Sequence, residues 1–185
     1  TRDSSKAMHI GLYENGSYVQ QSDVHMFLKH NHVLDDSSYT SDHFYSLQPS
    51  FVGEGAQTAK NAWHGRGLSS ESFGEASLDT QIVIGLCKLG IHPGDSLTFY
   101  YGDPDVRFSS TFSHFFEYVK ANYTSTSPNP FPPIWSISYG KSIFESSHPS
   151  ESITDLRNCI LSMQSAPGST TFIPVQVFVA SGDAG

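Results

Sequence analysis

Two carboxylic acids stand four residues apart in the stretch GEASLDTQ, which leads into an apolar run. A helix turns about 100° per residue, so Glu75 and Asp79 lie on one side of it, about 40° apart. Like charges at this spacing repel, and burial away from water raises the cost. Two close carboxyls can instead share one proton, which raises one pKa and lowers the other. The pair therefore predicts an acid–base device.

The same side of this helix carries an apolar stripe, which we expect to face the core with the two acids at its start. A purely structural account exists for Glu75, because Ser72-x-x-Glu75 fits a capping box and an acid in a first turn is favoured by the helix dipole. That account does not explain Asp79. The stripe consists of Leu78, Ile82, Leu86 and Leu89.

The elements that must position these acids alternate along the chain, with short strands rich in β-branched and aromatic residues separated by helical patterns. Three long polar segments interrupt the alternation, at Asp35–Gln48, Gly53–Ser72 and Ser125–Pro133. The predicted strands are His9–Tyr13, Ser96–Tyr101, Ile134–Tyr139, Val175–Ala180 and a weaker one near Phe51-Val52. The predicted helices are Ser22–His30, Glu75–Leu89, Thr111–Ala121 and Ser152–Ser165.

This alternation predicts an α/β fold with a mostly parallel sheet and helices on both faces. Functional loops in such sheets follow the carboxyl ends of the strands. Two loops are expected there, Ser138-Tyr139-Gly140 and Ser181-Gly182-Asp183. Taken alone, Asp183 also fits an ordinary turn residue that hydrogen-bonds its own backbone.

Composition narrows the class of protein. The chain of 185 residues carries a formal charge of −8 with no basic run, which argues against nucleic-acid and anionic-membrane partners. No apolar run is long enough for a membrane span. Few charged residues and two sequons, at Asn15 and Asn122, favour an exported glycoprotein, secreted or in a lysosomal or similar acidic vesicle, whose leader has been removed. No histidine pair has metal-ligand spacing, so no metal is expected in this chain.

The motifs GEASLDTQ, WSISYG and VFVASGDAG, in this order, resemble those of the serine-carboxyl peptidases, the sedolisin family, in its physarolisin and tripeptidyl-peptidase branches. The resemblance implies a subtilisin-like fold and peptide-bond hydrolysis in acid. It implies that Glu75 is the general base for a serine nucleophile and that Asp79 orients Glu75. It further implies that Asp183 supplies the oxyanion hole and that Ser138, Tyr139 and Gly140 bind extended substrate.

The sequence departs from the family in one respect. The downstream G-T-S motif that carries the family's serine, and the downstream calcium site, have no counterpart here. Since the chain stops just after a strand and its loop, we expect residues 1–185 to be the N-terminal portion of one catalytic domain. A complementary C-terminal chain, produced by processing of a precursor, or a lost segment would supply the serine and the calcium site.

Several alternatives stay open at this point. The resemblance fits both endopeptidases and tripeptidyl exopeptidases, and a non-catalytic peptide-binding or interaction module is the main alternative to an enzyme. An ordinary subtilisin-type reading would use His64 as base and Glu14 as its acid, but glycines follow His64 where a helix is needed. The letters His30-Asn31-His32 match a nuclease motif without its basic surface. Cys87 and Cys159 could form one bridge or remain two thiols.

Overall fold

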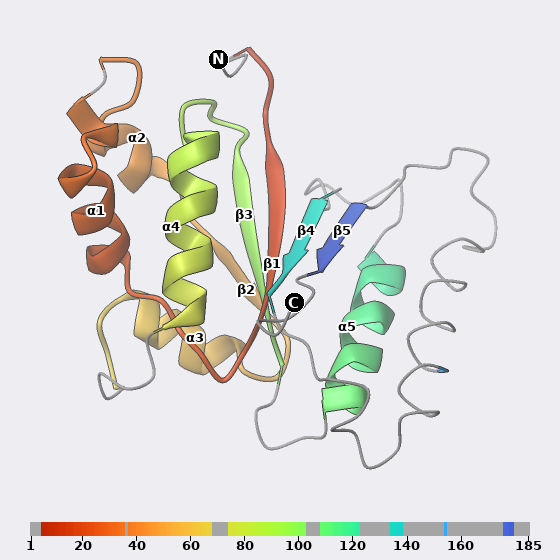
Figure 1. Cartoon of the computed structure of the whole chain (residues 1–185). Coiled ribbons are helices and arrows are strands. Elements are labelled where there is room, and N and C mark those ends of the chain that lie inside the picture. Colours follow the sequence, from red (N-terminus) through yellow and green to blue (C-terminus); the bar gives the residue numbers. More distant parts are fainter. Residues whose placement is uncertain are drawn as a thin grey trace, which may run out of the picture.

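A computed structural model describes residues 5–35, 37–67, 74–102, 108–122, 134–138, 154 and 176–179. Its centre is a five-stranded sheet in the order β2-β3-β1-β4-β5, and every neighbouring pair is parallel. Figure 1 shows β1 and β3 side by side at the middle of the sheet, with β4 and β5 beyond β1. The strands are β1 (His9–Asn15), β2 (Ser50–Val52), β3 (Ser96–Gly102), β4 (Ile134–Ile137) and β5 (Gln176–Val179). All five predicted strands are confirmed, with small shifts at their ends.

Helices cover both faces of this sheet, as the sequence predicted (Figure 1). One face packs against α4 (Glu75–Cys87), and α1 (Gln21–His30) lies outside α4; the other face packs against α5 (Phe108–Asn122). The predicted helix Ser152–Ser165 lies outside the described residues, except for Thr154. The α/β class with a parallel sheet is therefore confirmed.

Alternation along the strands explains the two faces. Leu12, Phe99 and Tyr101 belong to the core on the α4 side, whereas Tyr13 and Tyr100 belong to the core on the α5 side. Successive residues of a strand point to opposite faces, so a parallel sheet covered on both sides needs apolar side chains at nearly every position. The central strands HIGLYEN and SLTFYYG meet that need.

Two helices lie in segments that the sequence marked only as polar interruptions. Helix α2 spans Ser41–Ser46 and α3 spans Ala56–Trp63. In α2 the imidazole of His43 accepts a hydrogen bond from the backbone N–H of Thr40, which closes a capping box without a Glu. Helix α3 buries Ala59, Ala62 and Trp63, a face too small to give a clear apolar period. The sequence analysis predicted no helix in these two polar segments, and each contains one.

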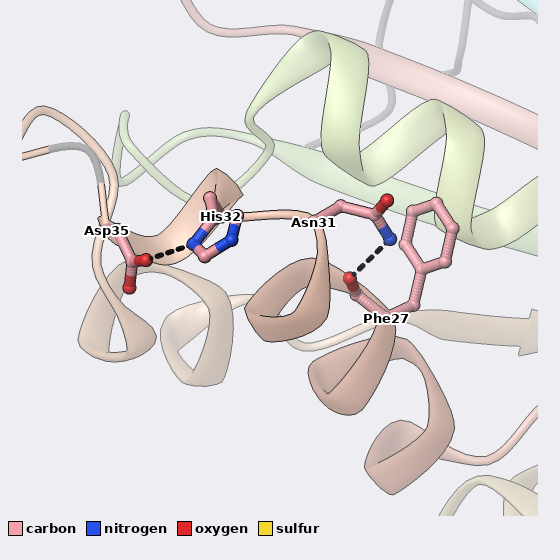
Figure 2. Close-up of polar contacts among 4 residues, drawn as sticks. All are labelled: Phe27, Asn31, His32 and Asp35. Carbon is pink, nitrogen blue, oxygen red and sulfur yellow. Dashed lines mark hydrogen bonds and ion pairs between the residues drawn. The ribbon is translucent and has the colours of Figure 1, made fainter.

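The His30-Asn31-His32 letters mark the end of α1 (Figure 2). The Asn31 side chain donates a 2.9 Å hydrogen bond to the carbonyl of Phe27, and the Asn31 backbone N–H donates to the same carbonyl. His32 takes a left-handed conformation with φ of 59°, and its Nδ1 lies 2.6 Å from Oδ2 of the exposed Asp35. These contacts terminate a helix, which explains the pattern without any nuclease chemistry.

Candidate functional site at the carboxyl edge of the sheet

The connection that follows β1 holds the start of α4 against the sheet. Oγ of Ser17 accepts a 3.2 Å hydrogen bond from the backbone N–H of Ala76, and the Ser77 hydroxyl donates to the carbonyl of Tyr18 at 3.4 Å. The helix begins at Glu75, directly after Gly74, with no side-chain hydrogen bond from its N-cap residue. Gly74 is thus the N-cap residue, Ser72 of the predicted capping box lies outside the described residues, and Ser17 satisfies a free N–H of the first turn.

The face of α4 that meets the core differs from the predicted one. Its buried side chains are those of Ala76, Thr80 and Ile84, whereas Leu78, Ile82 and Leu86 are 51%, 44% and 79% exposed. Leu89 lies beyond the end of the helix and is buried. The stripe predicted to face the core is thus an exposed apolar face of α4 in this chain.

The two predicted acids have unequal surroundings on this helix. Glu75 is exposed, whereas Asp79, one turn later, is half-buried. Burial raises the pKa of the Asp79 carboxyl, and a hydrogen bond from the Ser138 hydroxyl partly opposes that rise. Oδ2 of Asp79 is buried and makes no hydrogen bond within the described part of the chain. The Asp79 carboxyl therefore retains its proton to higher pH than an aspartate in water does.

The contact with Ser138 brings α4 to the carboxyl end of β4. Ser138 directly follows β4, and the last paired residues of β4 and β1 are Ile137 and Tyr13. Two predicted site residues that are far apart in sequence, Asp79 and Ser138, thus lie close enough for the serine hydroxyl to lower the pKa of the Asp79 carboxyl. Tyr139, Gly140 and Asp183 lie outside the described residues, as do Ser181 and Gly182 of the same predicted loop.

A third carboxyl group lies at this edge of the sheet, and we did not predict it to lie near Glu75 and Asp79. Glu14 is fully buried near the end of β1. It lies on the α4 face of the sheet because it is two residues after Leu12, and the register of β1 with β4 places it level with Ser138. An acid as the next-to-last residue of an otherwise apolar strand is the sequence signal that could have identified it.

The α5 face of the same edge holds a separate polar group. Glu54, which follows β2, accepts a 3.4 Å hydrogen bond from the Tyr100 hydroxyl, and its other oxygen lies 2.8 Å from Nδ1 of His114 on α5. Burial, with Glu54 nearby, raises the pKa of the Tyr100 hydroxyl, so it remains a hydrogen-bond donor at all ordinary pH values. These contacts tie α5 to the β2–α3 connection, on the opposite face from Asp79.

His64, the base in the subtilisin-type alternative, is exposed and is the C-cap residue of α3. It follows its helix instead of opening one, which is the arrangement expected from the glycines after it. The two sequon residues differ in accessibility. Asn15 is partly buried at the end of β1 with a buried Oδ1, whereas Asn122 is exposed at the end of α5. Asn122 is the better placed of the two predicted glycosylation sites.

Metal and membrane features can be assessed only for the part of the chain that the structure describes. Within it, no three His, Cys, Asp or Glu side chains are grouped as they would be to hold a metal ion. No helix among the described residues combines the length and hydropathy needed to cross a membrane. The partner of Cys87 in a possible bridge, Cys159, lies outside the described residues.

We expect Asp79→Asn to raise the thermal stability of the chain at neutral pH and to lose this advantage in acid. The folded-state pKa of Asp79 lies above the unfolded value of about 3.9. Folding therefore takes up a proton between the two values, and the stability of the wild type falls as pH rises through the raised pKa. Asparagine has nearly the shape of aspartic acid but carries no charge to desolvate.

Thermal unfolding followed by circular dichroism from pH 3 to pH 7 measures this difference. The matched control is Asp42→Asn, which neutralises an exposed acid in the first turn of α2 and should give no such gain. A difference between Asp79→Asn and wild type that stays constant over this pH range would contradict the assignment.

Comparison with known proteins leaves the site to be interpreted from its geometry. No family model matches the chain, and a search of the curated proteins finds no match.

Proposed function

We propose that the chain is the N-terminal part of the catalytic domain of an acid-acting serine-carboxyl peptidase of the sedolisin type, with a subtilisin-like fold. One observation carries the proposal. Asp79 is a half-buried carboxyl with a raised pKa, one helical turn from the exposed Glu75, and it lies near Ser138 at the carboxyl end of β4. An acid that serves only in a surface ion pair or a helix cap does not need to be half-buried with a raised pKa.

The different surroundings of the two acids suit different roles in catalysis. A serine hydroxyl is a weak nucleophile until a positioned base removes its proton. Glu75, which is accessible, takes that proton and later gives it to the leaving amine. Asp79 keeps its own proton to higher pH because burial raises its pKa, and in the assembled site it would donate a hydrogen bond that orients Glu75. A carboxylate can act as base in acid, where a histidine would already be protonated.

The remaining roles in the proposal come from the resemblance. Asp183, in its protonated form, donates a hydrogen bond to the oxyanion of the tetrahedral intermediate. The backbone of Ser138, Tyr139 and Gly140 pairs with an extended peptide substrate. The substrates are peptides or proteins, cleaved internally or as tripeptides from the amino end, in a secreted or lysosomal acidic setting.

The serine itself is proposed to lie on a complementary C-terminal chain, together with the calcium site. The exposed apolar face of α4 supports a partner of this kind, because Leu78, Ile82 and Leu86 follow one another at helical spacing and share the side that bears Glu75. A chain that covers this face would also close over the two acids. Covering the face would remove water from the site and strengthen the interactions within it.

The test is to isolate the protein with whatever chain remains bound to it and to measure peptide hydrolysis from pH 3 to pH 8. We expect a second polypeptide that contains a G-T-S segment, labelling of its serine by a serine-directed covalent inhibitor, and an acidic optimum. Activity should decline toward neutral pH, because a deprotonated Asp183 would repel the oxyanion. A neutral optimum, or label on a serine of this chain, would overturn the proposal.

The exposed face of α4 also suits the second candidate function, a non-catalytic module that binds peptides or a partner protein. The same isolation separates the two. A bound partner without a reactive serine, and an assembly without peptide hydrolysis at any pH, would favour the binding module.

A further inference from the structure

Helix α2 packs against the connection from α4 to β3, residues 88–95, and each side of this contact holds a half-buried histidine. Nδ1 of His43 accepts the backbone N–H of Thr40 at 3.0 Å, and Nδ1 of His92 accepts that of Gly94 at 2.9 Å. We propose that these two imidazoles form an acid-responsive switch, whose protonation loosens the contact between α2 and the α4–β3 connection. The contact lies at the amino end of the strands (Figure 1), so the inference is independent of the proposed peptidase site.

The partner of each imidazole fixes the role of its Nδ1. A backbone N–H can only donate, so Nδ1 of His43 and of His92 must present a lone pair, and each ring must be neutral with its proton on Nε2. A second proton occupies Nδ1 and turns it from an acceptor into a donor. The N–H groups of Thr40 and Gly94 would then lose these acceptors. Histidine in general titrates at about pH 6.5, so mild acid is enough to break such bonds.

Four other described histidines meet partners that tolerate a proton. The ring nitrogens of His25 and His9 lie beside serine hydroxyls, which can donate or accept. Nδ1 of His32 and of His114 lies beside a carboxylate, which binds a protonated ring more strongly. Mild acid therefore acts against the two proposed imidazoles and leaves these other contacts in place.

The α2 side of the contact depends on the backbone and ring of His43. A Cβ at Gly90 would collide with the His43 carbonyl oxygen, so the two backbones are in close contact. Oγ of Ser46 lies 2.7 Å from that carbonyl oxygen and 3.1 Å from the carbonyl oxygen of Gly90. The Tyr39 ring stacks on the His43 ring with centroids 6.0 Å apart, and its hydroxyl donates to the carbonyl of Leu89 at 2.7 Å. Since α2 has only six residues, it depends on its cap to stay formed.

The other side of the contact is the turn that His92 closes before β3. In this turn Oδ2 of Asp95 accepts the backbone N–H groups of Gly90 and His92, at 2.8 Å and 3.1 Å. Burial lowers the pKa of the neighbouring His9, so His9 gains its proton only at a lower pH. Protonation of both proposed imidazoles would thus weaken the two sides of one contact. The other titratable groups on the elements packed here are Asp42, His25 and Lys88.

Hydrogen–deuterium exchange of the chain at pH 7.5 and pH 5.0 tests the switch, with rates corrected for the intrinsic pH dependence of exchange. Histidines in general gain protons between these values, whereas ordinary carboxyls stay ionised. Protection of residues 37–48 and 88–96 should fall at pH 5.0 by about 2- to 30-fold, the effect of losing a helix cap. Equal protection at the two pH values would overturn the inference.

Two substitutions replace the imidazoles with acceptors that do not titrate. Glutamine at the position of His43 completes an ordinary capping box, and asparagine at the position of His92 can bond the backbone two residues on. The double variant His43→Gln, His92→Asn should therefore keep its protection at pH 5.0. His43→Ala combined with His92→Asn lacks the cap at both pH values. Its residues 37–48 should already be less protected at pH 7.5, without a further loss in acid.

The matched control is His25→Gln, which removes a titrating ring from α1 whose partner is a hydroxyl. It should lose protection in acid as the wild type does. The inference is wrong if either double variant responds to acid as strongly as the wild type, or if His25→Gln abolishes the response.

Discussion

Glu75→Gln is expected to reduce kcat of the two-chain assembly by about 10²- to 10⁴-fold, the usual contribution of a positioned general base. The amide has nearly the shape of the acid but cannot accept the serine proton. Glu75 is exposed at the start of α4, so the substitution should leave the fold and KM nearly unchanged. Steady-state kinetics at the acidic optimum, with the melting temperature measured in parallel, check the expectation.

A matched control for this loss is Glu117→Gln, which makes the same chemical change on the exposed side of α5, across the sheet. It should retain activity within about twofold, since screened surface charges contribute little. Retention of full activity by Glu75→Gln would exclude Glu75 as the base and would return Asp79 or Glu14 to consideration. Equal losses of kcat in the two variants would mean that the net charge of the chain, and not the candidate site, determines the activity.

We expect the largest loss of stability from Trp135→Ala, which should lower the free energy of unfolding by about 3–5 kcal/mol. Trp135 is fully buried on β4, and Phe115 and Tyr118 of α5 contact its ring edge-to-face. Its register partner on β1 is Gly11, and a methyl group at that glycine would stand 2.3 Å from two ring carbons. Gly11→Ala should therefore also lower the free energy of unfolding, by about 1–3 kcal/mol, because the added methyl group overpacks the core.

Urea unfolding of Gly11→Ala, of Trp135→Phe and of the double variant tests whether the two positions share one contact. Gly11→Ala combined with Trp135→Phe should be less unstable than the sum of the single changes, because the smaller ring leaves room for the methyl group. The control is Gly85→Ala on α4, where the new methyl would lie 3.4 Å from Leu28 and helix propensity favours alanine. That variant should be neutral or more stable, and a strictly additive double variant would contradict the shared contact.

Much of the architecture could be predicted from the sequence. The strands HIGLYEN and SLTFYYG are apolar at nearly every position, and such runs separated by helical patterns require a parallel sheet with both faces covered. The placement of Asp79 one turn after Glu75 on the same side of α4 follows from helical geometry alone. Helices α2 and α3 could not be found in this way, because a capping histidine and a face of two alanines and one tryptophan give no clear period.

The sequence by itself therefore determined that two acids share one side of a helix in an α/β fold. Only the tertiary structure decided which side of that helix meets the sheet. Helix α4 has two apolar sides, and the small Ala76 and Thr80 pack inward where the larger Leu78 and Ile82 do not. Helical periodicity alone cannot show which of the two sides is buried, because burial depends on the space that the neighbouring β-strands and α1 leave. The contact of Asp79 with Ser138 has the same origin, since strand pairing sets which distant residues meet at the sheet edge.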